Sequence, residues 1–335
     1  MPADRDYLEL ALAEAWKSAG HTRPNPPVGA VVVLDGKVVG VGRHRRCGGN
    51  HAEVAAMNNA IGNLRRSNAF QVGALPLKGA TVYVTLEPCS RSGRVGACTD
   101  ALIAAGVKRV VWAIPDPNPR NRGRARRVLA RAGIQGELFR GRLQGPENGP
   151  LVMDARALIA PFSKHVTTGL PYVTVKLAMS LDGRICDDWG EARWISSPAS
   201  RKLTGRIRER VDCVLVGAET IRRDDPSLLC HTRRNDDLWR AVVSRSGKLP
   251  PKSQVFTDAA RARTLVYASP REALADLGRR GFMHVLCEGG LGLARSLAAE
   301  GLVDEWLTVL SPVVIGASPI ASAVRYPGDD ALLRF

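Results

Sequence analysis

Apolar and polar residues follow two periodicities along this chain, and each periodicity predicts a kind of element. Residues 6–19 place apolar side chains at helical spacing and contain neither glycine nor proline, so we expect a helix there. Apolar runs at 28–34 and 38–41 flank Asp35-Gly36, a tight-turn dipeptide. Two short apolar runs around such a dipeptide predict a β-hairpin.

Helical spacing returns at residues 51–61, and the polar, glycine-containing residues 62–79 indicate a loop. Beyond that loop the two periodicities alternate: we expect strands at 80–86 and 107–114 and helices at 99–105 and 123–132. Strands that alternate with helices predict a layered α/β domain with a largely parallel sheet.

Glycine and proline interrupt this pattern between residues 140 and 170, which places a domain boundary near residue 148 and a helical connector at 150–162. The expected domains are therefore 1–148 and 149–335. A second α/β series follows the connector. It consists of expected strands at 172–179, 211–217, 239–244, 264–268, 284–288 and 305–310, and expected helices at 198–210 and 292–300.

Composition supports two globular domains and bears on location. The 335 residues suit two domains of about 150 residues each. No apolar run approaches the length of about 18 residues that a membrane span needs, so we expect no membrane association. The N-terminus lacks the apolar core of a secretory signal, and seven cysteines, an odd number, do not indicate a disulfide framework. We therefore expect a cytoplasmic protein.

The chain is strongly basic, with 48 Lys and Arg against 32 Asp and Glu and a net charge of +16. The basic residues concentrate at 120–131 and 201–210. Such a charge suits nucleic acid, an acidic membrane surface or phosphorylated small molecules, and it is also typical of a solvated basic face. Charge alone leaves these alternatives open.

Three residues indicate a metal site. His51 opens an expected helix, Cys89 follows a strand and a Glu-Pro turn, and Cys98 comes nine positions later. Catalytic zinc takes three protein ligands and leaves the fourth position to a water whose pKa it lowers. Glu53 is placed to move protons without being a ligand, as a deaminase requires. A His-x-Glu pair alone is common, but the combination in this order is specific.

The same segments carry a family resemblance. His51-Ala-Glu-Val, Thr85-Leu-Glu-Pro-Cys-Ser, Thr22-Arg-Pro-Asn-Pro-Pro and Asp116-Pro-Asn-Pro resemble the deaminase half of the bifunctional deaminase/reductases of riboflavin biosynthesis. The resemblance implies a cytidine-deaminase-like α/β/α fold. Eight residues separate Cys89 from Cys98, as in that family, whereas nucleic-acid deaminases of this fold commonly have Cys-x-x-Cys.

The resemblance also implies a substrate, a phosphoribosylated diaminopyrimidinone. Asn25 would hydrogen-bond its pyrimidine or ribose, and Arg94 would lie near its phosphate. From sequence alone Asn25 could equally form an Asx turn beside Pro26. The loop between the cysteines departs from the family pattern at Arg91-Ser92 and Gly96-Ala97.

The second half resembles the reductase half of the same family, which is similar to dihydrofolate reductase and uses NADPH. The resemblance rests on Lys176 to Gly183, on Gly217 to Leu228, and on Glu288-Gly-Gly-Leu-Gly, a strand-to-helix turn where backbone can approach a pyrophosphate. The implied cofactor contacts are Ala178, Trp194, Thr220, Asp224, Gly290, Leu291, Gly292, Leu293 and Ala294. The implied substrate contacts are Arg208, Leu228 and Glu288.

The resemblance predicts two reactions: hydrolytic deamination of the pyrimidine, then NADPH reduction of its ribosyl group to ribityl. Departures at Ala192, His231 and Ser244 leave a second interpretation open, an active deaminase whose reductase-like domain has lost catalysis. A third is a nucleic-acid deaminase or binding protein, which the long Cys89–Cys98 loop and the second domain disfavour. We also expect a homo-oligomer.

Overall fold

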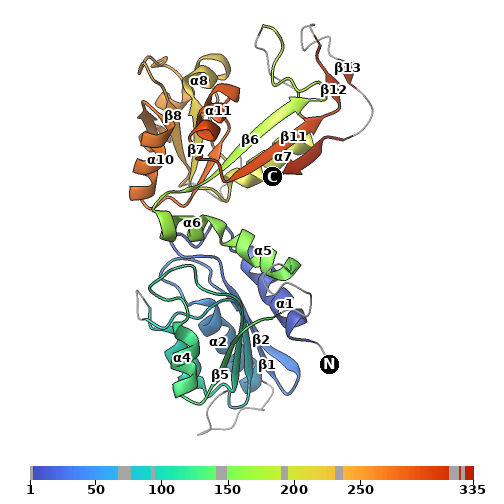
Figure 1. The fold of residues 1–335 in the computed structure, drawn as a ribbon, viewed down its shortest axis with the longest axis vertical. Coiled ribbons are helices and arrows are strands. Elements are labelled where there is room, and N and C mark those ends of the chain that lie inside the picture. The colour runs from blue at the N-terminus through green and yellow to red at the C-terminus, as the bar shows by residue number, and fades with distance from the viewer. Residues whose placement is uncertain are drawn as a thin grey trace. The chain divides into compact units, whose positions relative to one another are not determined.

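A computed structural model describes residues 3–66, 77–91, 95–140, 149–189, 195–230, 237–316 and 329–335, together with the backbone of 324–325. Contacts within the chain divide it into two compact units, Met1–Thr168 and Gly169–Phe335. Both units contain a β-sheet with helices packed on it (Figure 1). The sequence prediction of two α/β domains is confirmed.

The first unit is built on a five-stranded sheet of order β2-β1-β3-β4-β5. Its strands are β1 (Gly29–Leu34), β2 (Lys37–Arg43), β3 (Thr81–Leu86), β4 (Arg109–Ile114) and β5 (Gln135–Leu138). β3, β4 and β5 are parallel, while β1 runs antiparallel to both β2 and β3. The sheet is therefore mixed rather than largely parallel, because the predicted hairpin at Asp35-Gly36 supplies two of its strands.

Helices cover both faces of this sheet. α1 (Asp4–Trp16) packs on β1 and β3 beside α5 (Pro150–Leu158), as Figure 1 shows. The other face carries α2 (Ala52–Arg66), α3 (Cys98–Ala105) and α4 (Arg124–Arg131). This arrangement confirms the α/β/α fold that the sequence predicted.

Two glycines of β2 let α2 approach the sheet at backbone contact. A Cβ atom added to Gly42 would lie 2.2 Å from the Ala56 nitrogen, and one added to Gly40 would lie 2.3 Å from the Ala56 oxygen. Any side chain at these positions would push α2 away. α2 is thereby held at a fixed place against the sheet around Ala56 and Ala60.

The two units divide after Thr168, later in the chain than the boundary near residue 148 that the sequence indicates. The reason is the packing of α5, which buries its apolar residues against α1 and β4 in the core of the first unit: Leu151, Val152, Ala155 and Leu158. α6 (Ala160–Thr168) follows it. The connector helices thus belong structurally to the first unit, while residues 141–148 lie outside the described part.

The second unit is built on a seven-stranded sheet of order β14-β11-β6-β10-β7-β8-β9. Its strands are β6 (Tyr172–Ser180), β7 (Cys213–Gly217), β8 (Trp239–Val243), β9 (Thr264–Tyr267), β10 (His284–Cys287), β11 (Glu305–Ser311) and β14 (Ala331–Arg334). All neighbours are parallel except β14, which pairs antiparallel with β11. A separate pair joins β12 (Val313–Val314) to β13 (Val324–Arg325).

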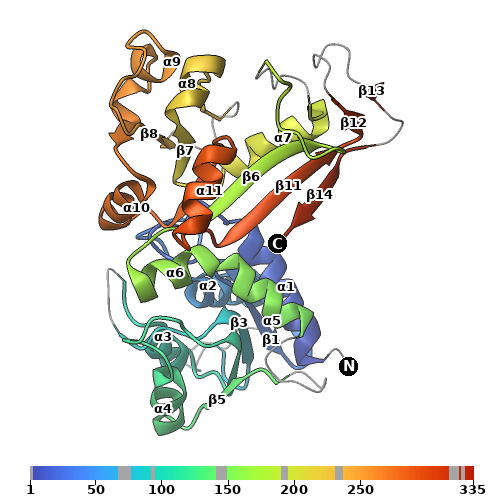
Figure 2. The ribbon, with the colours of Figure 1, turned by 45° about the horizontal axis from the view of Figure 1, so that its top comes forward.

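Alternate residues of the central strand β7 enter two different cores. Cys213 and Leu215 pack with α10 (Pro270–Arg279) and α11 (Leu291–Ala299). Val214 and Val216 pack on the opposite face with side chains from α7 (Pro198–Arg208), α8 (Ala218–Asp224) and α9 (Gln254–Thr257). Figure 2 shows α11 in front of β6 and α7 behind it. A strand covered on both faces explains the continuous apolar run in its sequence.

A short 3₁₀ helix, η2 (Arg261–Arg263), precedes β9. Within the described residues no helix combines the length and apolar character needed to cross a bilayer.

A buried guanidinium connects three segments beneath the second sheet. Arg240 of β8 is fully buried, and each of its five N–H donors has an acceptor. Two of them donate to the Asp258 carboxylate at 2.5 and 2.9 Å, and another donates to the Ser227 carbonyl at 3.0 Å. Asp258 therefore balances a charge that has no access to water.

We expect Asp258→Asn to destabilise the protein by about 1.5–3 kcal/mol at neutral pH, the range for hydrogen bonds to charged groups. The hydrogen bonds from Arg240 lower the pKa of Asp258 below its ordinary value of 3.8. The stabilisation is therefore complete above that ordinary value and is lost as the pH falls through the lowered pKa. Urea denaturation should show the two proteins converging in unfolding free energy in strong acid. A difference independent of pH would show that charge pairing is not its cause.

Candidate active sites

The three predicted metal ligands come together at one end of the first sheet. His51 lies directly before α2, and its carbonyl accepts the first hydrogen bond of that helix, from Ala55 at 2.9 Å. Cys89 follows β3, and Cys98 is the first residue of α3. His51 and Cys98 therefore lie at the amino ends of two helices, and the Cys98 N–H donates to Cys89 Sγ at 3.3 Å, so both thiols face a helix start whose dipole favours thiolates.

The ligand atoms lie at distances that suit one ion. His51 Nδ1 is 3.1 Å from Cys98 Sγ and 3.5 Å from Cys89 Sγ, and all three atoms lie within 4.8 Å of one another. These separations are compatible with a tetrahedral ion whose ligands lie about 2.0–2.3 Å from it. Hydrogen bonds from Cys98 and His51 lower the pKa of the Cys89 thiol, which favours the thiolate that binds metal. One imidazole and two thiols thus fit zinc.

Glu53 lies in the first turn of α2 and is 4% exposed. Burial, reinforced by the negative charge of Cys89, raises the pKa of Glu53 to about 7. A carboxyl group in this setting can hold or release a proton near neutrality. The close contact of α2 with Gly40 and Gly42 holds the helix that carries Glu53 at a fixed place on the sheet.

A histidine that the sequence analysis missed, His44, connects Asn25 to the metal ligand His51. His44 packs edge-on against the His51 ring, with centroids 5.2 Å apart. Its Nδ1 lies 3.0 Å from the Asn50 carbonyl, which can only accept, so Nδ1 carries the proton. The other ring nitrogen then accepts from the Asn25 amide at 3.1 Å. Burial lowers the pKa of His44, consistent with this neutral form.

The turn before Cys89 contains the buried Glu87 carboxylate, which accepts hydrogen bonds from the backbone of the segment that leads to α4. Glu87 is 3% exposed and accepts hydrogen bonds from the backbone of Asp116, Gly123 and Ala125 at 3.2, 3.0 and 3.2 Å. Glu87 therefore connects the end of β3 to the start of α4. The sequence motif around Cys89 includes this residue, but nothing in the pattern predicts its partners.

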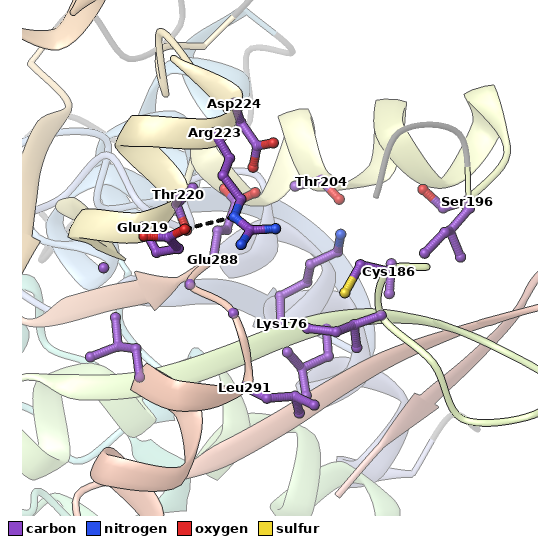
Figure 3. Close-up of a pocket in the computed structure, with 18 of the residues that line it drawn as sticks. Lys176, Cys186, Ser196, Thr204, Glu219, Thr220, Arg223, Asp224, Glu288 and Leu291 are labelled. Carbon is purple, nitrogen blue, oxygen red and sulfur yellow. Dashed lines mark hydrogen bonds and ion pairs between the residues drawn. The ribbon is translucent and has the colours of Figure 1, made fainter. Parts of the chain in front are cut away.

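The second unit contains a cavity of about 1060 Å³ over the carboxyl ends of its strands (Figure 3). Of the residues predicted to contact cofactor or substrate, nine line it: Ala178, Arg208, Thr220, Asp224, Glu288, Gly290, Leu291, Gly292 and Leu293. They come from four segments far apart in the sequence. The glycine-containing turn after Glu288 leads into α11, as the sequence indicated.

An ion pair and a half-buried lysine form the polar part of the lining of this cavity. Arg208 donates two hydrogen bonds to the Glu288 carboxylate, at 2.6 and 3.0 Å, and a third to the Leu229 carbonyl at 3.1 Å. Lys176 extends from β6 into the same cavity, opposite Glu219 and Arg223 of α8 (Figure 3). Burial lowers the pKa of Lys176, and the charge of Glu288 opposes that shift.

Other predicted residues lie elsewhere or outside the described part. Leu228 and Ala294 are 2% and 1% exposed and belong to the two cores rather than the cavity lining. Their predicted contacts with substrate and cofactor remain predictions. Ser244 is buried, and within the described residues its hydroxyl has no hydrogen-bond partner. The remaining predicted residues lie outside the described ranges: Arg94, Ala192, Trp194 and His231.

Two family models match the chain, one in each unit. Residues 1–114 match the cytidine and deoxycytidylate deaminase zinc-binding region, which contains His51, Glu53, Cys89 and Cys98. Residues 171–330 match the RibD C-terminal domain, which contains the cavity. Each candidate site thus falls within its own matched region.

Relatives match nearly the whole chain. The riboflavin biosynthesis protein RibD of Corynebacterium ammoniagenes is 37% identical and covers 94% of this chain and 88% of the relative. RibD of Escherichia coli strain K12 is 33% identical, with 94% and 89% covered. Among solved structures, Acinetobacter baumannii RibD, form 1, has a TM-score of 0.81 at 30% identity, covering 99% of this chain and 98% of that one.

Proposed function

This chain belongs to the RibD family of bifunctional deaminase/reductases of riboflavin biosynthesis, and we propose how the residues of its two sites divide that work. It is a zinc-dependent deaminase and an NADPH-dependent reductase. The observation that carries the assignment of residues is the cluster of His51, Cys89 and Cys98 around one point with Glu53 beside it.

In the deaminase, His51, Cys89 and Cys98 would hold the zinc ion. When bound, zinc supplies a water of lowered pKa as the nucleophile. Glu53 takes a proton from the attacking water and returns it to the amino group that leaves as ammonia. Asn25 binds the pyrimidine ring or ribose, and its amide is oriented for this by the neutral His44.

In the reductase, NADPH when bound supplies the hydride that adds to C1′ of the sugar. The bond from C1′ to the ring oxygen breaks, and that oxygen needs a proton as the ring opens to ribityl. We infer that Lys176 supplies this proton, because its side chain extends into the cavity and burial makes its ammonium more acidic than an exposed one. Glu288 and Arg208 hold each other in place beside it.

The substrate proposed for the deaminase is 2,5-diamino-6-(5-phosphoribosylamino)pyrimidin-4-one, and the reductase acts on its deaminated product. The exposed arginines of α4, which include Arg124, Arg126 and Arg131, support an anionic substrate by attracting its phosphate over a distance. No disulfide joins any of the described cysteines, which supports a reducing, cytoplasmic location. The homo-oligomer remains a prediction that analytical ultracentrifugation would test.

One assay tests the assignment. The aminopyrimidine substrate is supplied to the full chain, and ammonia release and NADPH oxidation are followed separately. We expect ammonia first, then NADPH consumption that depends on the deaminated product. Ammonia without NADPH consumption would favour the interpretation in which Ala192, His231 and Ser244 mark a reductase domain that has lost catalysis.

Removing zinc with a chelator should abolish ammonia release and leave the reductase rate unchanged when the deaminated product is supplied. The reductase cavity is lined by residues of the second unit, whereas the metal ligands belong to the first. Stopped-flow measurement of NADPH absorbance would show this independence. Parallel loss of both activities on chelation would contradict it.

A further inference from the structure

A side-chain amide outside every predicted site bridges the residues on both sides of one metal ligand. We propose that Asn121 is a positioning residue for the zinc ligand Cys89, fixing the course of the backbone through residues 88–90. The inference rests on the proposed zinc site, because Cys89 has no other role assigned to it. Asn121 lies in the turn before α4, 32 residues after Cys89 in the sequence.

The contacts of Asn121 surround Cys89 without touching it. Its Oδ1 accepts the Ser90 backbone N–H at 2.9 Å and the Ser90 hydroxyl at 3.2 Å. Its Nδ2 lies 3.5 Å from the Pro88 carbonyl, a longer contact on the other side of the ligand. β3 ends before residues 88–90. The Asn121 amide faces the Ser90 N–H and the Pro88 C=O, and so takes the place that a neighbouring strand would have.

The Asp116 carboxylate fixes the orientation of the Asn121 amide. Asn121 Nδ2 donates to Asp116 Oδ2 at 2.8 Å, so Oδ1 must face Ser90. Asp116 is in turn held by its own backbone N–H, which donates to Glu87 at 3.2 Å. Asn121 and Asp116 are 7% and 8% exposed, so these bonds form with little competition from water.

The opposite side of Cys89 is held by α3. The Thr99 N–H donates to the Cys89 carbonyl at 3.1 Å, and the Cys98 N–H donates to Cys89 Sγ at 3.3 Å. Both contacts come from the helix that carries the other thiolate ligand. Without Asn121, residues 88–90 would lose the side-chain hydrogen bonds that fix their backbone on the side away from α3. His51, the third ligand, directly precedes α2, which packs on β1 and β2.

This geometry predicts faster loss of zinc when the amide is removed. Residues that orient metal ligands typically contribute about 10–100-fold in metal affinity. Asn121→Leu, of similar size and without hydrogen bonds, should release zinc to a chelating dye about 10–100-fold faster than the unaltered protein. Asn121→Asp should do the same, since it keeps the acceptor but places a second carboxylate against Asp116.

Exchanging the two groups tests positioning directly. In Asp116→Asn/Asn121→Asp the amide at 116 donates to the carboxylate at 121, which still accepts from Ser90. Zinc release should return toward the original rate, and the thiolate-to-metal absorption band of the cobalt-substituted protein should return with it. Asn59→Leu is the control for loss of an asparagine side chain that accepts a backbone hydrogen bond, because the exposed Asn59 of α2 accepts the Val41 N–H at 3.0 Å and has no contact with residues 88–90 among its hydrogen bonds.

Different outcomes test the role of Asn121 and the proposed metal site. Equal zinc release from the unaltered protein and Asn121→Leu, with zinc bound in both, would overturn the role of Asn121 alone. So would a double variant that is no better than Asn121→Asp. Absence of zinc from the unaltered full chain would overturn the proposed metal site itself.

Discussion

Replacing Glu53 by glutamine should lower the rate constant of deamination by about 10²–10⁴-fold, the usual contribution of a positioned proton-transfer group. Glutamine has nearly the same shape and fits the same buried place in α2, but it cannot take a proton from water. The stoichiometry of bound zinc, measured by atomic absorption, should stay at one per chain. Ammonia release should fall while NADPH oxidation with the deaminated product stays unchanged.

His51→Ala is the comparison that separates a proton-transfer residue from a ligand. Removing a ligand should lower zinc content and deamination together, whereas Glu53→Gln should lower deamination only. If Glu53→Gln also lost the metal, the carboxylate would be a ligand and the predicted division of roles would be wrong. The same logic applies to Glu53→Ala, which should also keep its zinc.

The metal ligands could be predicted because their information is local. His51 and Glu53 are separated by one residue at a helix start, and Cys89 and Cys98 bracket one loop between a strand and a helix. Such spacings restrict geometry whatever the rest of the fold does. The alternation of strands and helices then placed both segments at the same edge of one sheet.

Residues whose roles depend on contacts between segments far apart in the sequence could not be predicted from local spacing. His44 ends a hairpin, and only its contacts with Asn25 and His51 reveal its function. Lys176 occupies an alternating position on β6 that sequence cannot distinguish from an exposed lysine. Asn121 looks like an ordinary turn residue until its partners Ser90 and Asp116 are known.

Two of the strands missed by the sequence analysis lack a clear periodic signal. β5 is four residues long and contains Gly136 and Glu137, so it shows no apolar alternation. β14 is exposed at every position and pairs only with β11 at the edge of its sheet. α10 was missed although its first turn has both a serine cap and a proline, the usual signals of a helix start.

In the reductase, Glu288→Gln should lower kcat/KM for NADPH-dependent reduction by about 10²-fold. Glu288 is the carboxylate that balances Arg208, whose side chain is 15% exposed, and its charge also acts on Lys176. Without this carboxylate the Arg208 guanidinium loses the charged partner that holds it in the cavity, and a misplacement of about 1 Å in an active site can cost about 10²-fold in rate. Ammonia release should not change.

Glu288→Gln should also shift the pH profile of the reduction in a defined direction. Glu288 raises the pKa of Lys176 against the effect of burial, so its removal should lower that pKa further. If reduction needs protonated Lys176, the alkaline limb of the pH profile should move to lower pH in Glu288→Gln. Lys176→Met should remove that limb altogether and reduce the rate at every pH. A Glu288→Gln protein whose alkaline limb stayed in place would exclude Lys176 as the proton source.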